Sequence, residues 1–245
     1  MLQLCEKMGL QLVHRHEAGA ENALPCEASM DPAPTVEPQI PRSISREDMA
    51  KLAIRRYEGR VRLVAAPGDL EEALADLRRE TIVGLDTETR PAFKKGESHL
   101  PALVQVATAR AVYLFQLRRT EVFPVLADLL SEPRTIKAGV SLKDDLRALK
   151  QVFPFEEKNM LDLGWVARSN GFGQTGVRNL AGILLGLRIP KGTKTSNWAA
   201  RDLSPAQIAY AATDAWACRE LYLRFQGLGL LQAKAPAASG AASGG

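Results

Sequence analysis

Three apolar runs of strand length follow one another between Thr81 and Leu117. They read TIVGLD, ALVQVAT and AVYLFQL, and they contain the β-branched and aromatic residues that strands favour. At most Ala109 and Arg110 separate the second run from the third, so these two runs predict a β-hairpin. A chain with this pattern has to build a sheet, and its helical segments have to cover that sheet.

Helical and strand patterns alternate on both sides of these runs. Before them we expect a leading helix in SREDMAKLAIRRYEG, a strand in VRLVAA, and a helix in GDLEEALADLRRE with Asp69 as its N-cap and Glu72 three residues later. After them we expect a helix in VFPVLADLLSE, a strand in TIKAGV, a helix in SLKDDLRALKQVF, and only helices beyond. In the last helix Ser204 and Pro205 supply the N-cap and the first position. This alternation predicts an α/β or α+β domain with one mixed sheet.

Both ends of the chain lack the large apolar residues that a core needs. Residues 1–45 are predicted to be a disordered or extended segment, because the stretch from 20 to 43 is rich in Ala, Glu and Pro. Residues 230–245 are predicted to be a low-complexity tail. A single domain over residues 46–229, beginning with the leading helix, is therefore expected.

The net charge and the cysteines indicate the class of binding partner and the cellular compartment. The whole chain carries +4 at pH 7 and residues 1–45 carry −3, so the remaining chain is basic, as suits a nucleic-acid partner. No run is apolar enough to cross a membrane, and the N-terminus does not have the pattern of a signal peptide. The three cysteines form no CxxC pair, which argues against a zinc cluster and a disulfide framework and favours the reducing cytoplasm.

The first candidate site is IVGLDTET, in which a buried-looking strand ends in Asp86 and Glu88. Residues i and i+2 of a strand share a face, so the two carboxylates are expected to lie side by side. At about 5 Å they repel by roughly 3 kcal/mol at an effective dielectric near 20. A divalent cation with a preference for oxygen ligands reverses that sign. The alternative is a solvated acidic pair without a function.

The second candidate site is SLKDDL, which holds two adjacent acids. Asp144 stands three residues after Ser141, the spacing of a capping box. Asp145 shares a helix face with Leu142 and Leu149, and a carboxylate on an apolar face needs a partner. That partner is either a functional ligand or a buried Arg or Lys.

The third candidate site is YAATDAW. Tyr210 and Asp214 are four residues apart, so they lie on one helix face among Ala, Trp and Cys residues. The alternative is a Tyr–Asp hydrogen bond that only satisfies a buried group.

The segment GFGQTG matches the glycine pattern of a dinucleotide-binding loop. That fingerprint requires a preceding strand and a following acid, whereas here LGWVARSN reads as the end of a helix. A helix C-cap followed by a loop is the better interpretation, and a nucleotide-binding protein is rejected.

Taken together, LDTET, KAGVSLKDDLRAL and SNWAARDLSPAQIAYAATDAWA resemble the tyrosine subgroup of the DEDD family of 3′–5′ exonucleases. The family includes ribonuclease D and the exonuclease domain of the Werner syndrome protein, and the resemblance covers roughly Thr81 to Phe225. The histidine subgroup does not fit, because position 209 is Ala and all three histidines precede the second motif.

The resemblance implies a ribonuclease H-like α/β fold, with a mixed sheet flanked by helices, and two divalent cations, Mg²⁺ or Mn²⁺. The implied metal ligands are Asp86, Glu88, Asp145 and Asp214, with Tyr210 orienting the attacking water. The substrate would be a single-stranded or frayed 3′ end of DNA or RNA, and the product a nucleoside 5′-monophosphate. The candidates for substrate contact are Thr87, Lys191, Lys194 and Arg201, the last three of which also read as a solvated basic loop.

The main alternative is a catalytically inactive nucleic-acid-binding or scaffold domain on the same fold. The presence of all five motif residues argues against that alternative, because a decayed site should have lost at least one acid. The sequence indicates no protein partner and no membrane association.

Overall fold

The computed structural model describes residues 40–94, 96–191 and 196–232. Most of the two predicted tails therefore lies outside the described residues. Ile40, Leu230 and Leu231, which the prediction assigned to the tails, pack against an apolar cluster of the core.

The centre of the fold is a mixed sheet in the order β1-β4-β3-β2-β5-β6. β2 pairs antiparallel with β3 and β3 with β4, so the predicted hairpin is confirmed. β1 runs parallel to β4, and β2, β5 and β6 run parallel to one another. The strands are β1 (Arg60–Leu63), β2 (Ile82–Thr89), β3 (Pro101–Ala107), β4 (Ala111–Gln116), β5 (Ile136–Gly139) and β6 (Met160–Asp162).

The prediction of only helices after β5 is wrong, because β6 follows it. β6 is three residues long, too short for an alternating pattern to show in the sequence. Its extended conformation comes from pairing with β5, where Ala138 lies opposite Leu161.

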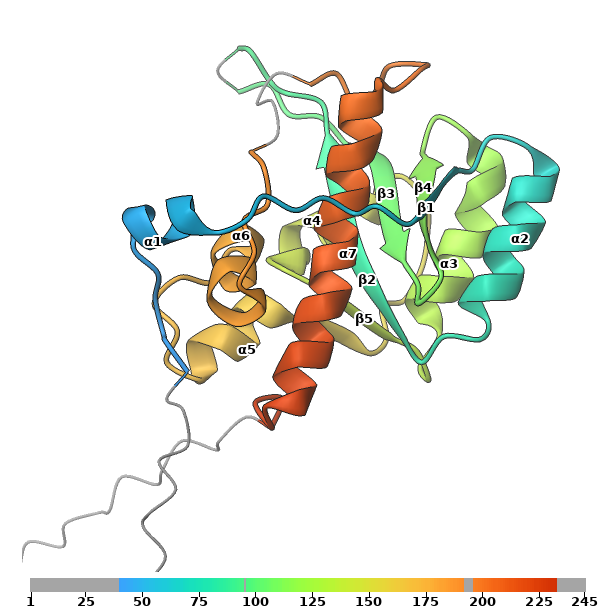
Figure 1. Cartoon of the computed structure of the whole chain (residues 1–245). Coiled ribbons are helices and arrows are strands. Elements are labelled where there is room, and N and C mark those ends of the chain that lie inside the picture. The colour runs from blue at the N-terminus through green and yellow to red at the C-terminus, as the bar shows by residue number, and fades with distance from the viewer. Residues whose placement is uncertain (1–39, 95, 192–195, 233–245) are drawn as a thin grey trace, which may run out of the picture. The chain divides into compact units, whose positions relative to one another are not determined.

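Helices cover both faces of the sheet (Figure 1). One face carries α2 (Pro67–Leu77), α3 (Phe123–Ser131) and α4 (Leu142–Leu149). The other carries α5 (Leu163–Ser169), α6 (Val177–Leu180) and the long α7 (Pro205–Gly227). A 3₁₀ turn (Thr120–Val122) precedes α3, and a π-helical turn (Ala181–Leu185) follows α6. This layered arrangement confirms the predicted α/β fold with a mixed sheet.

A glycine in β2 lets α7 lie directly on the sheet. A Cβ atom at Gly84 would be 2.0 Å from the carbonyl oxygen of Ala215 and 2.7 Å from the amide nitrogen of Arg219. Real Cβ atoms do not approach backbone atoms this closely, so only glycine permits the contact. The neighbouring Val83 and Leu85 point to the opposite face and are fully buried there.

Of the two predicted N-caps, the one for α7 is confirmed and the one for α2 is wrong. Ser204 caps α7 as predicted, since its hydroxyl accepts from the amide of Gln207 at 3.3 Å. The prediction for α2 is wrong, because the helix begins at Pro67, whose ring pre-sets the first helical position. Asp69 lies inside the first turn and accepts from the amides of Ala65 and Ala66.

The leading helix is shorter than predicted. α1 spans Arg46–Lys51, and the chain after it continues across α6 and α7 in an extended form (Figure 1). Backbone hydrogen bonds from Arg55 to Arg188 (3.0 Å) and from Arg188 to Ala53 (2.9 Å) take the place of further helical turns. The amide of Tyr57 then donates to the Thr213 hydroxyl of α7 at 3.0 Å. We refer to residues 40–59 as the leading segment.

Candidate active site

Two carboxylates of β2 and one of α7 meet beside the sheet. Asp86 and Glu88 point to the same face as Gly84, as the period of two in a strand requires. α7 lies on that face and contributes Asp214. Carboxylate oxygens of Asp86, Glu88 and Asp214 all lie within 4.8 Å of one another. The side-by-side placement expected for Asp86 and Glu88 is therefore present, and the fold adds the third acid.

The α7 face that carries Asp214 is deeply buried. Asp214 is 3% exposed, and its Oδ1 atom has no hydrogen-bond partner among the residues described. Tyr210 lies one turn earlier, and a hydrogen bond links its hydroxyl to the Asp214 carboxyl group. The Tyr–Asp hydrogen bond considered as the alternative is thus present. It still leaves one buried oxygen of Asp214 without a partner among the described residues, and that oxygen can bind a ligand.

The cluster raises the proton affinity of its own carboxylates. Burial raises the pKa of Asp86 well above its ordinary value, and the charges of Asp214 and Glu88 raise it further. Burial, followed by the charges of Asp214 and Asp145, raises the pKa of Glu88 to about 8. Burial raises the pKa of Asp214 to about 6, although Tyr210 and Arg178 act in the opposite direction. Among the described residues no ion pair compensates the negative charge of this cluster, as expected of a cation site.

The fourth acid comes from the other face of the sheet. Thr87 points away from Asp86, and its hydroxyl donates to Oδ1 of Asp145 on α4 at 2.6 Å. Asp145 lies on the face that buries Leu142, Leu146 and Leu149, as predicted. Burial raises the pKa of Asp145, while the Thr87 hydrogen bond lowers it. In the described chain the partner of Asp145 is therefore a hydroxyl, and the alternative of a buried Arg or Lys is not observed.

The capping box predicted for Asp144 is wrong. Ser141 has a left-handed backbone (φ 60°), and its side chain makes no capping hydrogen bond. Asp144 instead points into solvent, with 87% of its side chain exposed, and lies 3.4 Å from Arg147. The adjacent acids therefore have different environments, because successive helix residues are about 100° apart.

Sequence reasoning missed Gln105. This residue of β3 lies directly opposite Asp86 in the antiparallel pair, so both side chains share a face. It is fully buried, and neither polar atom of its amide has a partner among the described residues. The signal in the sequence was a single polar residue in the middle of the apolar run ALVQVAT.

A comparison with known proteins decides the family. A family model described as 3′–5′ exonuclease matches residues 61–228. The chain belongs to the 3′–5′ exonuclease family. The family predicted from the three motifs is thereby confirmed.

Named relatives and a solved structure agree with this family. The exonuclease-family chain is 34% identical over 164 residues to ribonuclease D of Gluconacetobacter diazotrophicus, covering 65% of this chain and 41% of that protein. It is 31% identical over 154 residues to the Mus musculus bifunctional 3′–5′ exonuclease/ATP-dependent helicase WRN, covering 60% of this chain and 11% of that protein. The crystal structure of the Aedes aegypti Nibbler EXO domain matches with a TM-score of 0.62 at 23% identity, covering 72% of this chain and 93% of that one.

These matches also define the limits of the likeness. The chain spans less than half the length of the two curated relatives. The structural match shows a shared fold, which confirms the ribonuclease H-like architecture. Within the residues that the structure describes, no helix combines the length and hydropathy needed to cross a bilayer.

The four residues predicted to contact substrate differ in their exposure and in their contacts. Arg201 is exposed, and its carbonyl oxygen accepts from the Gln116 side chain at 3.2 Å. Lys191 is exposed and lines two neighbouring cavities. Lys194 lies outside the described residues. The Thr87 hydroxyl is engaged by Asp145. Their contact with a substrate stays a prediction.

The GFGQTG segment does not form a dinucleotide-binding loop. α5 ends at Ser169, and Gly171 follows with φ 79°, the left-handed conformation that commonly ends a helix. The rejection of the nucleotide-binding interpretation is therefore supported by the position of the segment.

Proposed function

We propose that this chain is a two-metal-ion 3′–5′ exonuclease that hydrolyses phosphodiester bonds at the 3′ end of DNA or RNA. One observation carries the proposal. The carboxylates of Asp86, Glu88 and Asp214 lie within 4.8 Å of one another, and one buried oxygen of Asp214 has no partner among the described residues.

The residues present fit divalent cations such as Mg²⁺ or Mn²⁺. Carboxylate oxygens are the hard ligands that these ions prefer. Asp86, Glu88 and Asp214 would hold one ion, and Asp86 with Asp145 would serve the second. When bound, such ions neutralise a phosphodiester and lower the pKa of the attacking water.

Tyr210 supports the reaction as a hydrogen-bonding group. Burial, followed by the charge of Asp214, raises the pKa of its phenol far above the ordinary value. The hydroxyl is therefore protonated at neutral pH and orients the attacking water rather than removing its proton. Its ring lies next to Trp198, with the ring centroids 6.1 Å apart, so the hydroxyl is held by packing as well as by Asp214.

Thr87 holds the fourth acid. Its short hydrogen bond to Asp145 joins the end of β2 to the first turn of α4. Thr87 lies between Asp86 and Glu88 in β2, so its hydrogen bond also fixes the position of Asp145 relative to these two acids.

The proposed reaction consumes one water for each nucleotide removed. The water oxygen bonds to phosphorus, the bond from phosphorus to the 3′ oxygen breaks, and that oxygen leaves with a proton as a hydroxyl. The products are a nucleoside 5′-monophosphate and a strand with a new 3′-hydroxyl end.

Single-stranded DNA and RNA oligonucleotides labelled at the 5′ end test the proposal. We expect the label to remain on a ladder of shortened strands, EDTA to stop the reaction, and Mg²⁺ or Mn²⁺ to restore it. The same experiment decides between DNA and RNA, which the chain itself does not distinguish. Release of the label in the first product, or full activity in EDTA, would contradict the proposal.

A further inference from the structure

A groove lined by basic residues lies between the leading segment and α6. It has a volume of about 920 Å³. Its charged lining residues are Arg46, Arg178, Arg188 and Lys191, and no Asp or Glu lines it. The other lining residues are neutral, so the groove presents positive charge only.

The wall that the leading segment contributes is fixed to the domain. The Gln174 side chain accepts from the amide of Ile44 at 2.9 Å and donates to the carbonyl of Ile44 at 3.2 Å. Arg188 exchanges backbone hydrogen bonds with Ala53 and Arg55. The leading segment precedes residues 61–228, so the groove is partly built by residues that the family model does not cover.

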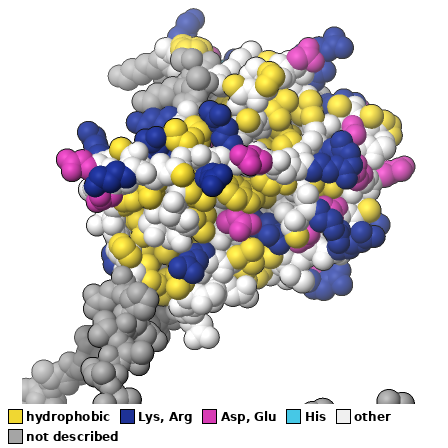
Figure 2. All heavy atoms as spheres, in the orientation of Figure 1, with side chains coloured by type: hydrophobic (Ala, Val, Ile, Leu, Met, Phe, Trp, Pro, Cys, Tyr) yellow, Lys and Arg dark blue, Asp and Glu magenta, His cyan; other side chains and the backbone are white. Residues whose placement is uncertain are grey.

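The positive charges of the groove have no ion-pair partner among residues 40–94, 96–191 and 196–232. In the part of the chain that the structure describes, none of the four basic side chains lies within ion-pair distance of an acid. Arg178 donates to the carbonyl oxygen of Ile189 at 3.2 Å, a contact with a neutral acceptor. Figure 2 shows Lys and Arg side chains at several places on one face of the molecule, with Asp and Glu side chains among them.

The groove is adjacent to a second cavity. This cavity of about 580 Å³ shares Ile189, Pro190 and Lys191 with the groove and extends to Tyr210. Arg178 also lies within electrostatic reach of Asp214. The groove is therefore next to a cavity that reaches Tyr210, one helical turn from Asp214.

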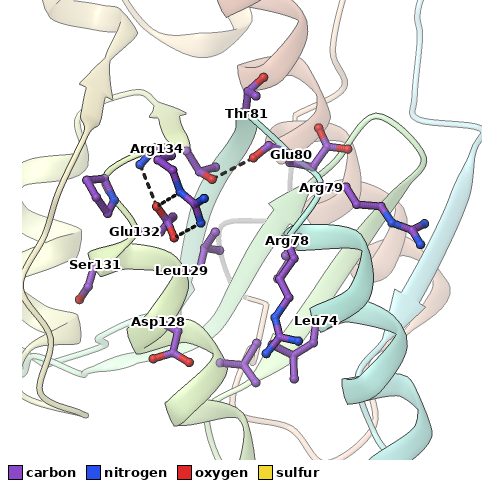
Figure 3. Close-up of a pocket in the computed structure, with 14 residues that line it drawn as sticks. Leu74, Arg78, Arg79, Glu80, Thr81, Asp128, Leu129, Ser131, Glu132 and Arg134 are labelled. Carbon is purple, nitrogen blue, oxygen red and sulfur yellow. Dashed lines mark hydrogen bonds and ion pairs between the residues drawn. The ribbon is translucent and has the colours of Figure 1, made fainter.

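A pocket elsewhere on the molecule carries balanced charges instead. The pocket between the ends of α2 and α3, of about 630 Å³, contains Arg78, Arg79 and Arg134 together with Glu80, Asp128 and Glu132 (Figure 3). Its charges balance, and Arg134 is paired with Glu132 at 2.9 Å. Thr81, the residue before β2, lines this pocket and lies roughly 20 Å from Glu88 at about 3.3 Å per strand residue.

We propose that the basic groove binds the sugar–phosphate backbone of the substrate strand on the 5′ side of the nucleotide being removed. The inference rests on the proposed function, since it assumes that the 3′ end lies at the acids. Repeated phosphates match a group of Arg and Lys side chains that form no ion pair with the described residues, and such contacts do not depend on base sequence. The groove thus gives the chain affinity for strands several nucleotides long.

The test compares two double variants. Arg46→Gln/Arg188→Gln removes two charges from the groove and keeps the backbone hydrogen bonds of Arg188. Arg78→Gln/Arg79→Gln removes two charges from the balanced pocket and is the matched control. Melting curves establish that both variants fold, and the single substitution Arg46→Gln serves if the double variant does not.

Binding of a fluorescent single-stranded oligonucleotide of 12 nucleotides is measured in EDTA at several salt concentrations. We expect the groove variant to bind about tenfold more weakly, a loss of about 1.4 kcal/mol for the two charges together. Its salt dependence should be shallower by about 1.4 in the slope of log K against log salt, at roughly 0.7 per lost phosphate contact. Hydrolysis of a dinucleotide in Mg²⁺ should be unchanged, and the control variant should behave like the parent.

The possible failures are distinguishable. The proposal that the groove binds the strand is overturned if the groove variant keeps the affinity and salt slope of the parent. It is also overturned if the control variant loses as much affinity as the groove variant. Absence of hydrolysis in the parent protein, with groove-dependent binding retained, overturns the proposed function and leaves the groove as a binding surface.

Discussion

Replacing Glu88 by Gln should stabilise the protein without metal and destabilise it relative to the parent with metal. Glu88 is partly buried beside Asp86 and Asp214, and these charges together with burial raise its pKa from 4.5 to about 8. A carboxyl group with a raised pKa binds its proton more tightly in the folded protein than in the unfolded chain. Folding stability is therefore lost as the pH rises from about 4.5 through about 8.

The size of the effect follows from that pKa. At about 1.4 kcal/mol per pKa unit, the change from 4.5 to about 8 sets an upper bound of about 5 kcal/mol. Solvent that reaches the partly exposed carboxylate reduces this, so we expect a gain of about 1–3 kcal/mol for Glu88→Gln at pH 8. In a domain of this size that corresponds to about 2–4 °C in Tm for each kcal/mol. At pH 4, where Glu88 is protonated in both states, the gain should vanish.

Thermal unfolding from pH 4 to pH 9 measures the effect in EDTA and in Mg²⁺. With metal at a thousandfold excess over Kd the order should reverse, because the parent gains about 4.1 kcal/mol and the variant, which lacks a ligand, gains less. Glu121→Gln is the matched control, since Glu121 is exposed and far from the other acids in sequence, and it should show neither effect. A variant that is less stable than the parent in EDTA at pH 8, by the same amount as at pH 4, would refute the reasoning.

Three further substitutions separate the roles of neighbouring residues. Asp145→Ala should nearly abolish hydrolysis. Asp144→Ala should keep most of the hydrolysis and change the free energy of unfolding by less than about 1 kcal/mol, because Asp144 makes only an exposed ion pair. Turnover and Tm of the two variants check this, and the opposite result would contradict the assignment of Asp145 to the buried face of α4. Tyr210→Phe should lower turnover by about 10² and leave the Mg²⁺ midpoint unchanged, because a positioning group is lost and no metal ligand is; a fall in Tm with normal turnover would indicate a purely structural role. Gly84→Ala should lower Tm by several degrees, because its Cβ would collide with α7; an unchanged Tm would show that α7 can move away at no cost.

Local patterns predicted most of the elements and the acids. The apolar runs predicted β2, β3 and β4, and the spacing of Ser204 and Pro205 predicted the start of α7, because these features depend on residues close in the sequence. The same reasoning placed Asp86 beside Glu88 and Tyr210 beside Asp214, since strand and helix periods fix which residues share a face.

Predictions failed where the deciding contact was distant or the backbone departed from the common conformation. β6 exists because β5 pairs with it, and the leading helix ends early because Ala53 and Arg55 bond to Arg188 instead. The left-handed Ser141 removes a cap that the spacing of Ser141 and Asp144 predicted. None of these follows from a pattern of neighbouring residues.

The sequence by itself determined which residue types stand at which spacing, that is, four acids and a tyrosine in an order typical of one exonuclease family. Only the tertiary structure decided that Thr87 bonds Asp145 across 58 positions, that Gln105 lies opposite Asp86, and that the leading segment forms a basic groove with α6. The physical reason is that the period of a helix or strand, which decides which of its side chains share a face, depends on that element alone. Which elements meet depends on the burial of whole faces, and here α7 meets β2 because Gly84 leaves room for it.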